Sequence, residues 1–127
     1  MTANKWLPAV YLKAFPPELP TLAEAAIMSM PFVFDQSTAG GVRADIQFRV
    51  RGAEPGSYWL RIADDRCTSF EGKASAPQVI IHSPDTVWMR IVRGEIDGAQ
   101  ALASGLFRIE GDATVLASLS TWFPARR

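Results

Sequence analysis

Apolar residues recur at every second position over much of residues 42–82, which predicts a run of short strands. In "ADIQFRVRG", Ile46, Phe48 and Val50 alternate with polar residues that begin at Asp45 and Gln47. Successive side chains of a strand point to opposite faces, so this period predicts one buried and one polar face. "SYWLRIADD" and "CTSFEG" follow after short turns, and "QVIIH" is a short apolar fourth strand. Strands joined by such turns predict an antiparallel meander.

The period changes at Ser83, where "SPDT" predicts the start of a helix. Ser83 suits the N-cap position and Pro84 the first helical position, where its missing N–H costs nothing. Apolar residues then fall on one side of the segment as far as about Arg93. Gly94 follows, and glycine is the common residue just beyond a helix C-terminus.

Two glycines bracket the last predicted strand. The short helix "GAQALAS" stops at Gly105, "LFRIE" alternates apolar and charged residues, and Gly111 follows. Gly105 suits a helix C-terminus, and Gly111 allows a sharp turn. Asp112 suits the N-cap of a last helix, which Pro124 ends.

The N-terminal region reads differently from the rest. Residues 1–20 hold four prolines and no clear period, so we expect an extended arm there. "TLAE" at Thr21–Glu24 fits a capping box, and a short helix to about Met30 would end before Pro31. "PFVFDQSTAGG" then reads as a loop. We expect residues 21–127 to form a single domain.

The order of elements is helix, four strands, two helices, strand, helix. Strands with one apolar face and helices with one apolar stripe pack in layers. The sequence therefore predicts an α+β fold, with a five-stranded, mostly antiparallel sheet and helices packed on one face.

Composition narrows the classes of partner and compartment. The chain has 127 residues, 13 basic and 13 acidic, and a formal net charge of zero. A nucleic-acid-binding domain normally carries a basic excess, which is absent, so we expect no nucleic-acid partner. Cys67 is the single cysteine, so no internal disulfide forms, and the cytoplasm is the expected compartment. No segment predicts a membrane span, although transient membrane contact stays open.

Catalytic and metal-binding patterns are missing from the sequence. His82 is the single histidine, no G-x-S-x-G elbow accompanies it, and no glycine-rich phosphate loop follows a strand. One His and one Cys do not make a metal site. We therefore expect no enzyme activity, no cofactor and no metal. An arginine stripe on the polar strand faces could meet phosphates, but a solvated face balanced by acids is favoured; the stripe comprises Arg43, Arg49, Arg51 and Arg61.

Several segments in order resemble the sterol carrier protein type 2 domain. They are "IQFRVRG", "GSYWLRIADDR" and "QVIIHSPDTVWMRIVRGEIDGAQALASGLFRIEGD". The last contains the family pattern of a glycine, an aromatic or leucine, an isoleucine, and a Gly-Asp pair. The resemblance covers about Val42 to Phe123. It implies a lipid-binding protein in which an apolar tunnel lies between sheet and helices.

The resemblance also implies which residues would line that tunnel. They are the inward apolar positions of the strands and the stripes of the helices, and we call this set the predicted ligand wall. Its members are Phe48, Val50, Leu60, Ile62, Ile81, Trp88, Ile91, Val92, Phe107, Ile109, Leu116, Leu119 and Trp122. A filled core of this fold would need the same residues, so the sequence does not decide between a cavity and a packed interior.

The sequence leaves three alternative functions. The first is non-catalytic binding or transport of a fatty acid, sterol, acyl-CoA or prenyl lipid, with Tyr58, Gln78 or Arg90 at the mouth. The second is an accessory or dimerisation module that assists a lipid- or quinone-modifying enzyme. Its partner would be that enzyme or a second copy of the chain, bound through an exposed apolar patch of Trp6, Tyr11, Phe15 or Phe32. The third, an enzyme with a dispersed site, is disfavoured because no nucleophile and base can be paired.

Overall fold

The computed structural model describes residues 23–124, and their alternating segments form one five-stranded sheet. The strands are β1 (Ala44–Arg51), β2 (Gly56–Ala63), β3 (Arg66–Glu71), β4 (Val79–Pro84) and β5 (Arg108–Gly111). Their order across the sheet is β3-β2-β1-β4-β5. The pairs β1–β2, β2–β3 and β4–β5 are antiparallel, and β1–β4 is parallel. The predicted α+β class and mostly antiparallel sheet are confirmed.

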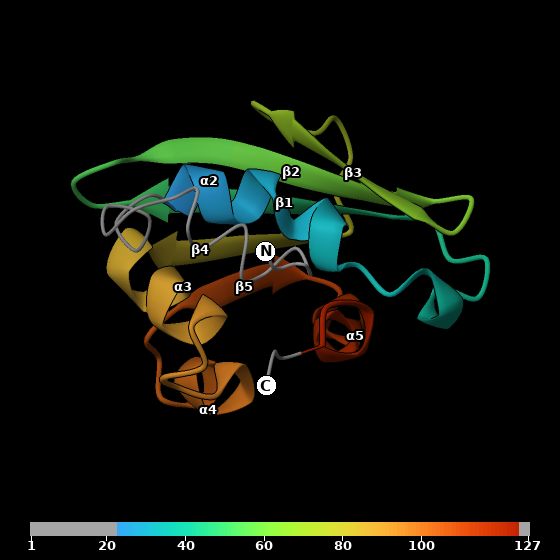
Figure 1. Ribbon diagram of the computed structural model, residues 1–127. Coiled ribbons are helices and arrows are strands. Elements are labelled where there is room, and N and C mark those ends of the chain that lie inside the picture. The colour runs from blue at the N-terminus through green and yellow to red at the C-terminus, as the bar shows by residue number, and fades with distance from the viewer. Residues whose placement is uncertain (1–22, 125–127) are drawn as a thin grey trace, which may run out of the picture.

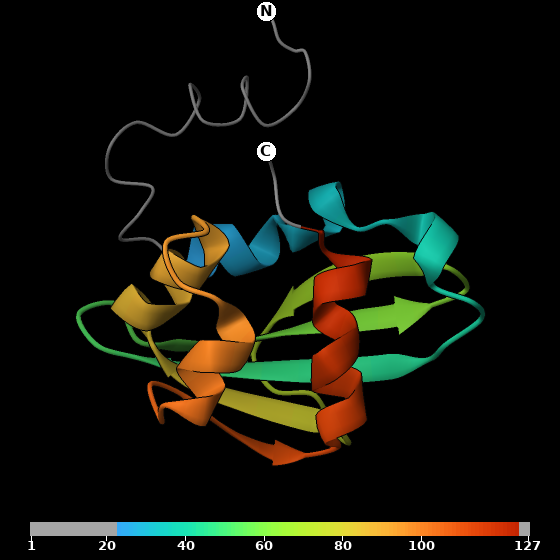
Figure 2. The ribbon, with the colours of Figure 1, turned by 90° about the horizontal axis from the view of Figure 1, so that it is seen from below.

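The helices cover one face of this sheet, which we call the helical face. Figure 1 shows α3 (Asp85–Val92), α4 (Gly98–Ala103) and α5 (Ala113–Trp122) on one side of the strands. Figure 2, seen from below, places them in front of the strands, with α3 and α4 toward one end and α5 toward the other. The first described helix, α2 (Ala23–Met28), packs against β2, β3 and α3.

The hydrophobic core lies in the layer between the sheet and the helices. Ile46 and Leu60 are directly paired on β1 and β2, and both are fully buried. Phe48 and Ile81 continue the same face across β1 and β4. Burying such side chains contributes about 1.5–3 kcal/mol each relative to leaving them in water. The two-residue alternation read from the sequence therefore fixes which strand face meets the helices.

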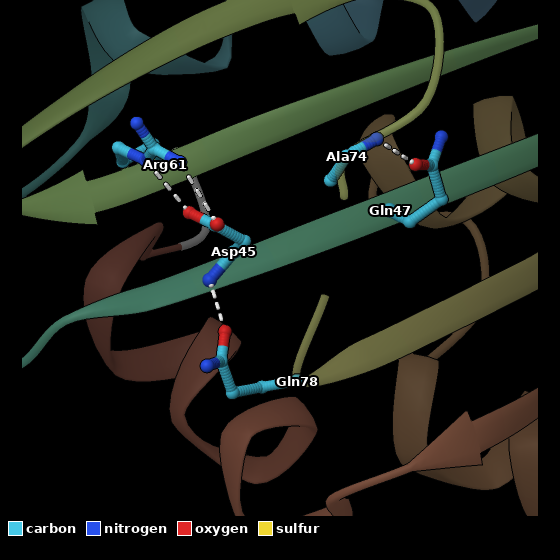
Figure 3. A network of polar contacts seen from close by, with 5 residues as sticks. All are labelled: Asp45, Gln47, Arg61, Ala74 and Gln78. Carbon is cyan, nitrogen blue, oxygen red and sulfur yellow. Dashed lines mark hydrogen bonds and ion pairs between the residues drawn. The ribbon is translucent and has the colours of Figure 1, made fainter. Parts of the chain in front are cut away.

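The opposite, open face is not uniformly solvated, and this corrects the sequence prediction. Asp45 and Gln47 were expected on a solvated face, yet they are 6% and 1% exposed. The connection over residues 72–78 links β3 to β4, which lie on opposite sides of the β2–β1 pair, so it must cross the sheet. Ala74 N donates to Gln47 Oε1 over 2.7 Å and Gln78 N to Asp45 O over 2.9 Å, so the connection crosses the open face (Figure 3).

Several predicted boundaries also shift. Ser83 belongs to β4, opposite Val50, so it does not cap α3. Its hydroxyl donates to Pro84 O, and Pro84 occupies the N-cap position without a side-chain cap. The fifth strand begins at Arg108, after the two apolar residues that were predicted to open it.

The first helix ends earlier than expected. It stops at Met28, and Pro31 lies inside a short 3-10 helix, η2 (Met30–Val33). The predicted loop that follows contains a second one, η3 (Gln36–Thr38), where Asp35 accepts from Ser37 N. Proline restricts the residue before it, which favours this change of helix type. Thr21 of the predicted capping box and the arm over residues 1–20 lie outside the described residues.

Candidate functional site

The predicted ligand wall converges on one apolar cluster between sheet and helices. Its deeply buried members are Phe48, Val50, Leu60, Ile62, Ile81, Trp88, Phe107 and Trp122. Its half-buried members are Ile91, Ile109, Leu116 and Leu119, which pack against the same cluster. The structure thus brings together every predicted wall residue except Val92.

Val92 lies at the C-terminal end of α3 and is 48% exposed. The buried residues of the helix are Asp85, Trp88 and Met89, while Ile91 packs half-buried against the same cluster. Met89 is 2% exposed and was missed by the sequence analysis. Met89 lies four residues after Asp85, so both fall on one face of the helix. That face did not read as apolar in the sequence because it contains the Asp85 carboxylate.

Trp88 occupies the centre of this cluster. Its ring contacts Phe48 edge-on, with centroids 5.0 Å apart, and Phe107 edge-on at 6.3 Å. Edge-on contacts of this kind suit aromatic rings because the positive edge of one faces the negative face of the other. Trp88 is 5% exposed, and its Nε1 has no hydrogen-bond acceptor. A buried N–H without a partner costs about 1–3 kcal/mol.

The helical wall of the cluster is less complete than the sheet wall. On α5 only Trp122 is buried, whereas Val115, Leu116 and Leu119, and Phe123 at the C-cap, are half-buried while packing against the core. On β4, which α5 contacts, Val79 and Ile81 are by contrast fully buried. Apolar surface therefore remains accessible along α5.

The three side chains predicted at the mouth are scattered. Tyr58 lies on the helical face, where burial, followed by Glu24, Glu71 and Glu54, raises the pKa of its phenol. Gln78 lies on the open-face side, where its Oε1 accepts from Asp45 N over 2.5 Å. Arg90 lies on the outer surface of α3, 3.7 Å from Glu95. Of the three, only Tyr58 belongs to the buried apolar cluster.

A shallow groove of about 400 Å³ lies beside the start of β3 and the two 3-10 helices. It is lined by Pro31, Phe34, Gln36, Asp65, Arg66, Cys67 and Thr68. Cys67 faces this groove from the sheet, and burial raises the pKa of its thiol to about 12. A thiol with that pKa is almost wholly protonated at neutral pH and is a poor nucleophile.

The open face carries ion pairs and no catalytic constellation among the described residues. His82 Nε2 lies 2.7 Å from Glu110 Oε2, and Arg108 Nη1 lies 3.3 Å from the same oxygen. These contacts, His82 first, lower the pKa of the Glu110 carboxyl. Between residues 23 and 124 no group of three or more His, Cys, Asp or Glu could hold a metal ion. Within the same range no helix is both long and apolar enough to cross a membrane.

The sheet order, the one-sided helices and the apolar layer define an α+β sandwich of the sterol-carrier type. The family model described as the SCP-2 sterol transfer family matches residues 36–124. The chain therefore belongs to that family, which confirms the resemblance seen in the sequence. No curated protein sequence matches the chain.

Solved structures with the same fold belong to proteins of different kinds. The sterol carrier protein 2 of Aedes aegypti, in complex with the C16 fatty acid palmitate, is 14% identical with a TM-score of 0.60, over 86% of this chain and 98% of that one. The ubiquinone synthesis protein UbiJ-SCP2 is 14% identical with a TM-score of 0.62, over 84% and 96%. The sec-alkylsulfatase Pisa1 of Pseudomonas sp. is 14% identical with a TM-score of 0.67, over 77% of this chain but 16% of the enzyme. At these identities the likeness shows the shared fold.

Proposed function

We propose that this protein binds a hydrophobic ligand non-catalytically between the helical face of the sheet and helices α3–α5. The observation that carries the proposal is the contrast along α5. Three apolar side chains of this helix, with Phe123 at its C-cap, pack against the core yet stay half-buried, whereas Val79 and Ile81 of the contacting strand β4 are fully buried. An alkyl chain lying there would remove that remaining surface from water, at roughly 25 cal/mol per Å² before ordering costs.

Family membership supports the same function. The matched family is one of sterol transfer, and a structure with this fold holds palmitate. The described wall offers dispersion contacts and few polar groups, which suits broad rather than narrow selectivity. The ligand classes that fit are fatty acids, sterols, acyl-CoA and prenyl lipids.

Calorimetric titration of the full chain with palmitate tests this proposal, using two neighbouring substitutions on α5. Leu116 is half-buried in the cluster and Ala117 is exposed on the same helix. L116N should weaken binding by roughly ten-fold, because it replaces buried apolar surface with an amide. A117N should bind as the wild type does. Equal affinities for both variants would contradict the proposed ligand position.

A second function is supported by different observations. Phe32, on η2, is 66% exposed, the most of any large hydrophobic side chain among the described residues, and we infer that another protein could contact it. The same fold occurs in a ubiquinone synthesis protein and as part of a sulfatase. A module that assists a lipid- or quinone-modifying enzyme would use this exposed ring. F32S should then abolish association with such an enzyme while leaving palmitate binding unchanged.

A further inference from the structure

Within residues 23–124, the indole N–H of Trp88 is a buried side-chain group that the fold leaves without a hydrogen-bond partner. In the part of the chain that the structure describes, no other buried side-chain nitrogen or oxygen lacks a hydrogen bond. Gln47 shows how well the fold normally satisfies such groups, since its amide makes four contacts with the backbone. The unpaired N–H at the centre of the aromatic cluster is therefore an exception, and we look for a hydrogen-bond acceptor that is absent from the protein itself.

The position of this N–H links it to the ligand. Trp88 packs edge-on against Phe48 of the sheet and Phe107 before β5, so it joins the helical and sheet walls of the proposed site. The hydrocarbon surfaces around it offer no acceptor. A ligand that entered this layer with an acceptor atom would recover the hydrogen bond that the free protein lacks.

The charges around Trp88 restrict what that acceptor can be. The buried polar or charged residues of the described chain are Asp45, Gln47, Ser83 and Asp85, with no Lys or Arg among them. Asp85 lies one turn before Trp88 on α3, and its carboxylate is engaged by Glu54 N and Thr86 N. A ligand carboxylate placed here would be desolvated without a buried cation to pair with it, which is strongly unfavourable. A neutral acceptor avoids that cost.

We propose that the ligand of this protein carries a neutral hydrogen-bond acceptor, an ester or ketone carbonyl or a hydroxyl, which accepts from Trp88 Nε1 with the polar end directed into the core layer. This inference rests on the proposed function and deepens it. The hydrocarbon part of the ligand lies along the half-buried side chains of α5, where Leu116 and Leu119 contact the cluster.

Nuclear magnetic resonance of the nitrogen-labelled full chain observes this hydrogen bond directly. The chain has four tryptophans, so the indole region is simple, and W88F identifies the Trp88 signal by its loss. If W88F fails to fold, contacts to the Phe48 and Phe107 rings identify the signal in the wild type. The probes are methyl palmitate, palmitate and hexadecane, which share an alkyl chain and differ in their polar end.

Methyl palmitate should move the Trp88 indole proton downfield, while hexadecane should bind without that shift and palmitate should produce a smaller one. W88F should lose about five-fold more affinity for methyl palmitate than for hexadecane, because the smaller ring weakens both but only the ester loses a hydrogen bond. The control is W59F, because Trp59 stacks on Phe70 on the open face, away from the site.

The outcomes separate the two levels of the proposal. Methyl palmitate binding with an unmoved Trp88 signal would overturn the Trp88 contact and leave the proposed function standing. A shift with palmitate as large as that with the ester would overturn the neutral acceptor. Failure of all three probes to bind would overturn the proposed function and this inference with it.

Discussion

Arg61 and Asp45 stand at directly paired positions on β2 and β1, and the guanidinium donates to both carboxylate oxygens. The distances are 2.9 Å from Nε to Oδ1 and 3.1 Å from Nη2 to Oδ2. The Asp45 side chain is 9% exposed and that of Arg61 is 36% exposed. Arg61 also lies over Trp59, with its guanidinium carbon 5.0 Å from the ring centroid. This pair anchors the open face where the connection to β4 ends (Figure 3).

The unequal exposure of the two partners predicts unequal effects of removing either one. R61Q leaves the Asp45 carboxylate buried without a counter-charge, whereas D45N leaves a guanidinium that water can reach. R61Q should therefore lower the free energy of unfolding more than D45N, as measured by urea denaturation. R49Q is the control, since Arg49 is exposed on β1, and it should be close to neutral. A greater loss in D45N than in R61Q would show that the desolvated carboxylate is not the dominant cost.

Gln47 predicts an effect on stability that is local to the crossing connection. Its Nε2 donates to Tyr58 O and Gly72 O, each over 3.0 Å, and its Oε1 accepts from Ala74 N. Q47L removes these contacts and leaves buried backbone groups unpaired, so it should destabilise the fold by about 1–3 kcal/mol. Hydrogen exchange at the Ala74 amide should accelerate with it. Q100L, on the exposed side of α4, should change neither quantity. Unchanged exchange at Ala74 in Q47L would show that the crossing connection does not depend on this side chain.

The two glycines around β5 form a matched pair. Gly105 has φ +77° and open space where a methyl group would lie, whereas Gly111 has φ +103° and a Cβ there would overlap Gln78 O. G105A should lower the free energy of unfolding only by the penalty of a left-handed backbone, about 1–2 kcal/mol. G111A adds the collision with Gln78 O, just before β4, and should lower the melting temperature clearly further. Equal thermal shifts for the two variants would mean that the backbone of residue 78 yields at little cost.

Cys67 provides a prediction of pH dependence. Burial raises the pKa of its thiol from 9.0 to about 12, so the folded state disfavours the thiolate. Between those two values the unfolded chain releases a proton that the folded chain retains, so stability should fall as the pH rises. The alkylation rate with iodoacetamide should stay low through pH 9 and keep rising beyond it, unlike that of free cysteine. C67A should remove the part of the fall in unfolding free energy at alkaline pH that is due to this thiol. A reaction rate that levels off near pH 9 would contradict the burial of the thiol.

The sequence was sufficient for the sheet and most of the core because alternation determines which strand face is apolar. It was not sufficient for Asp45 and Gln47, since a period of two separates faces without revealing what crosses them. Their burial depends on the β3–β4 connection, which the strand order requires and local pattern does not encode. The prediction of Ser83 as an N-cap was wrong for a related reason. Its side chain suits that position, but the residue pairs with Val50 in the sheet.

The candidate site shows the same limits. Periodicity brought Trp88 and Ile91 to the cluster, yet it placed Val92 there and omitted Met89, because α3 buries the stripe that includes Asp85. No pattern in the sequence could have indicated that the Trp88 N–H lacks an acceptor. That property depends on the positions of every neighbouring carbonyl and hydroxyl, which only the folded chain defines.

Native mass spectrometry of the full chain, freshly purified and then extracted with organic solvent, tests lipid binding most directly. We predict a defined mass increment for one bound lipid per chain, restored after delipidation by adding methyl palmitate. A bare mass that does not change on adding methyl palmitate, palmitate or a sterol would mean that the aromatic side chains fill the core. That result would contradict the proposed ligand site.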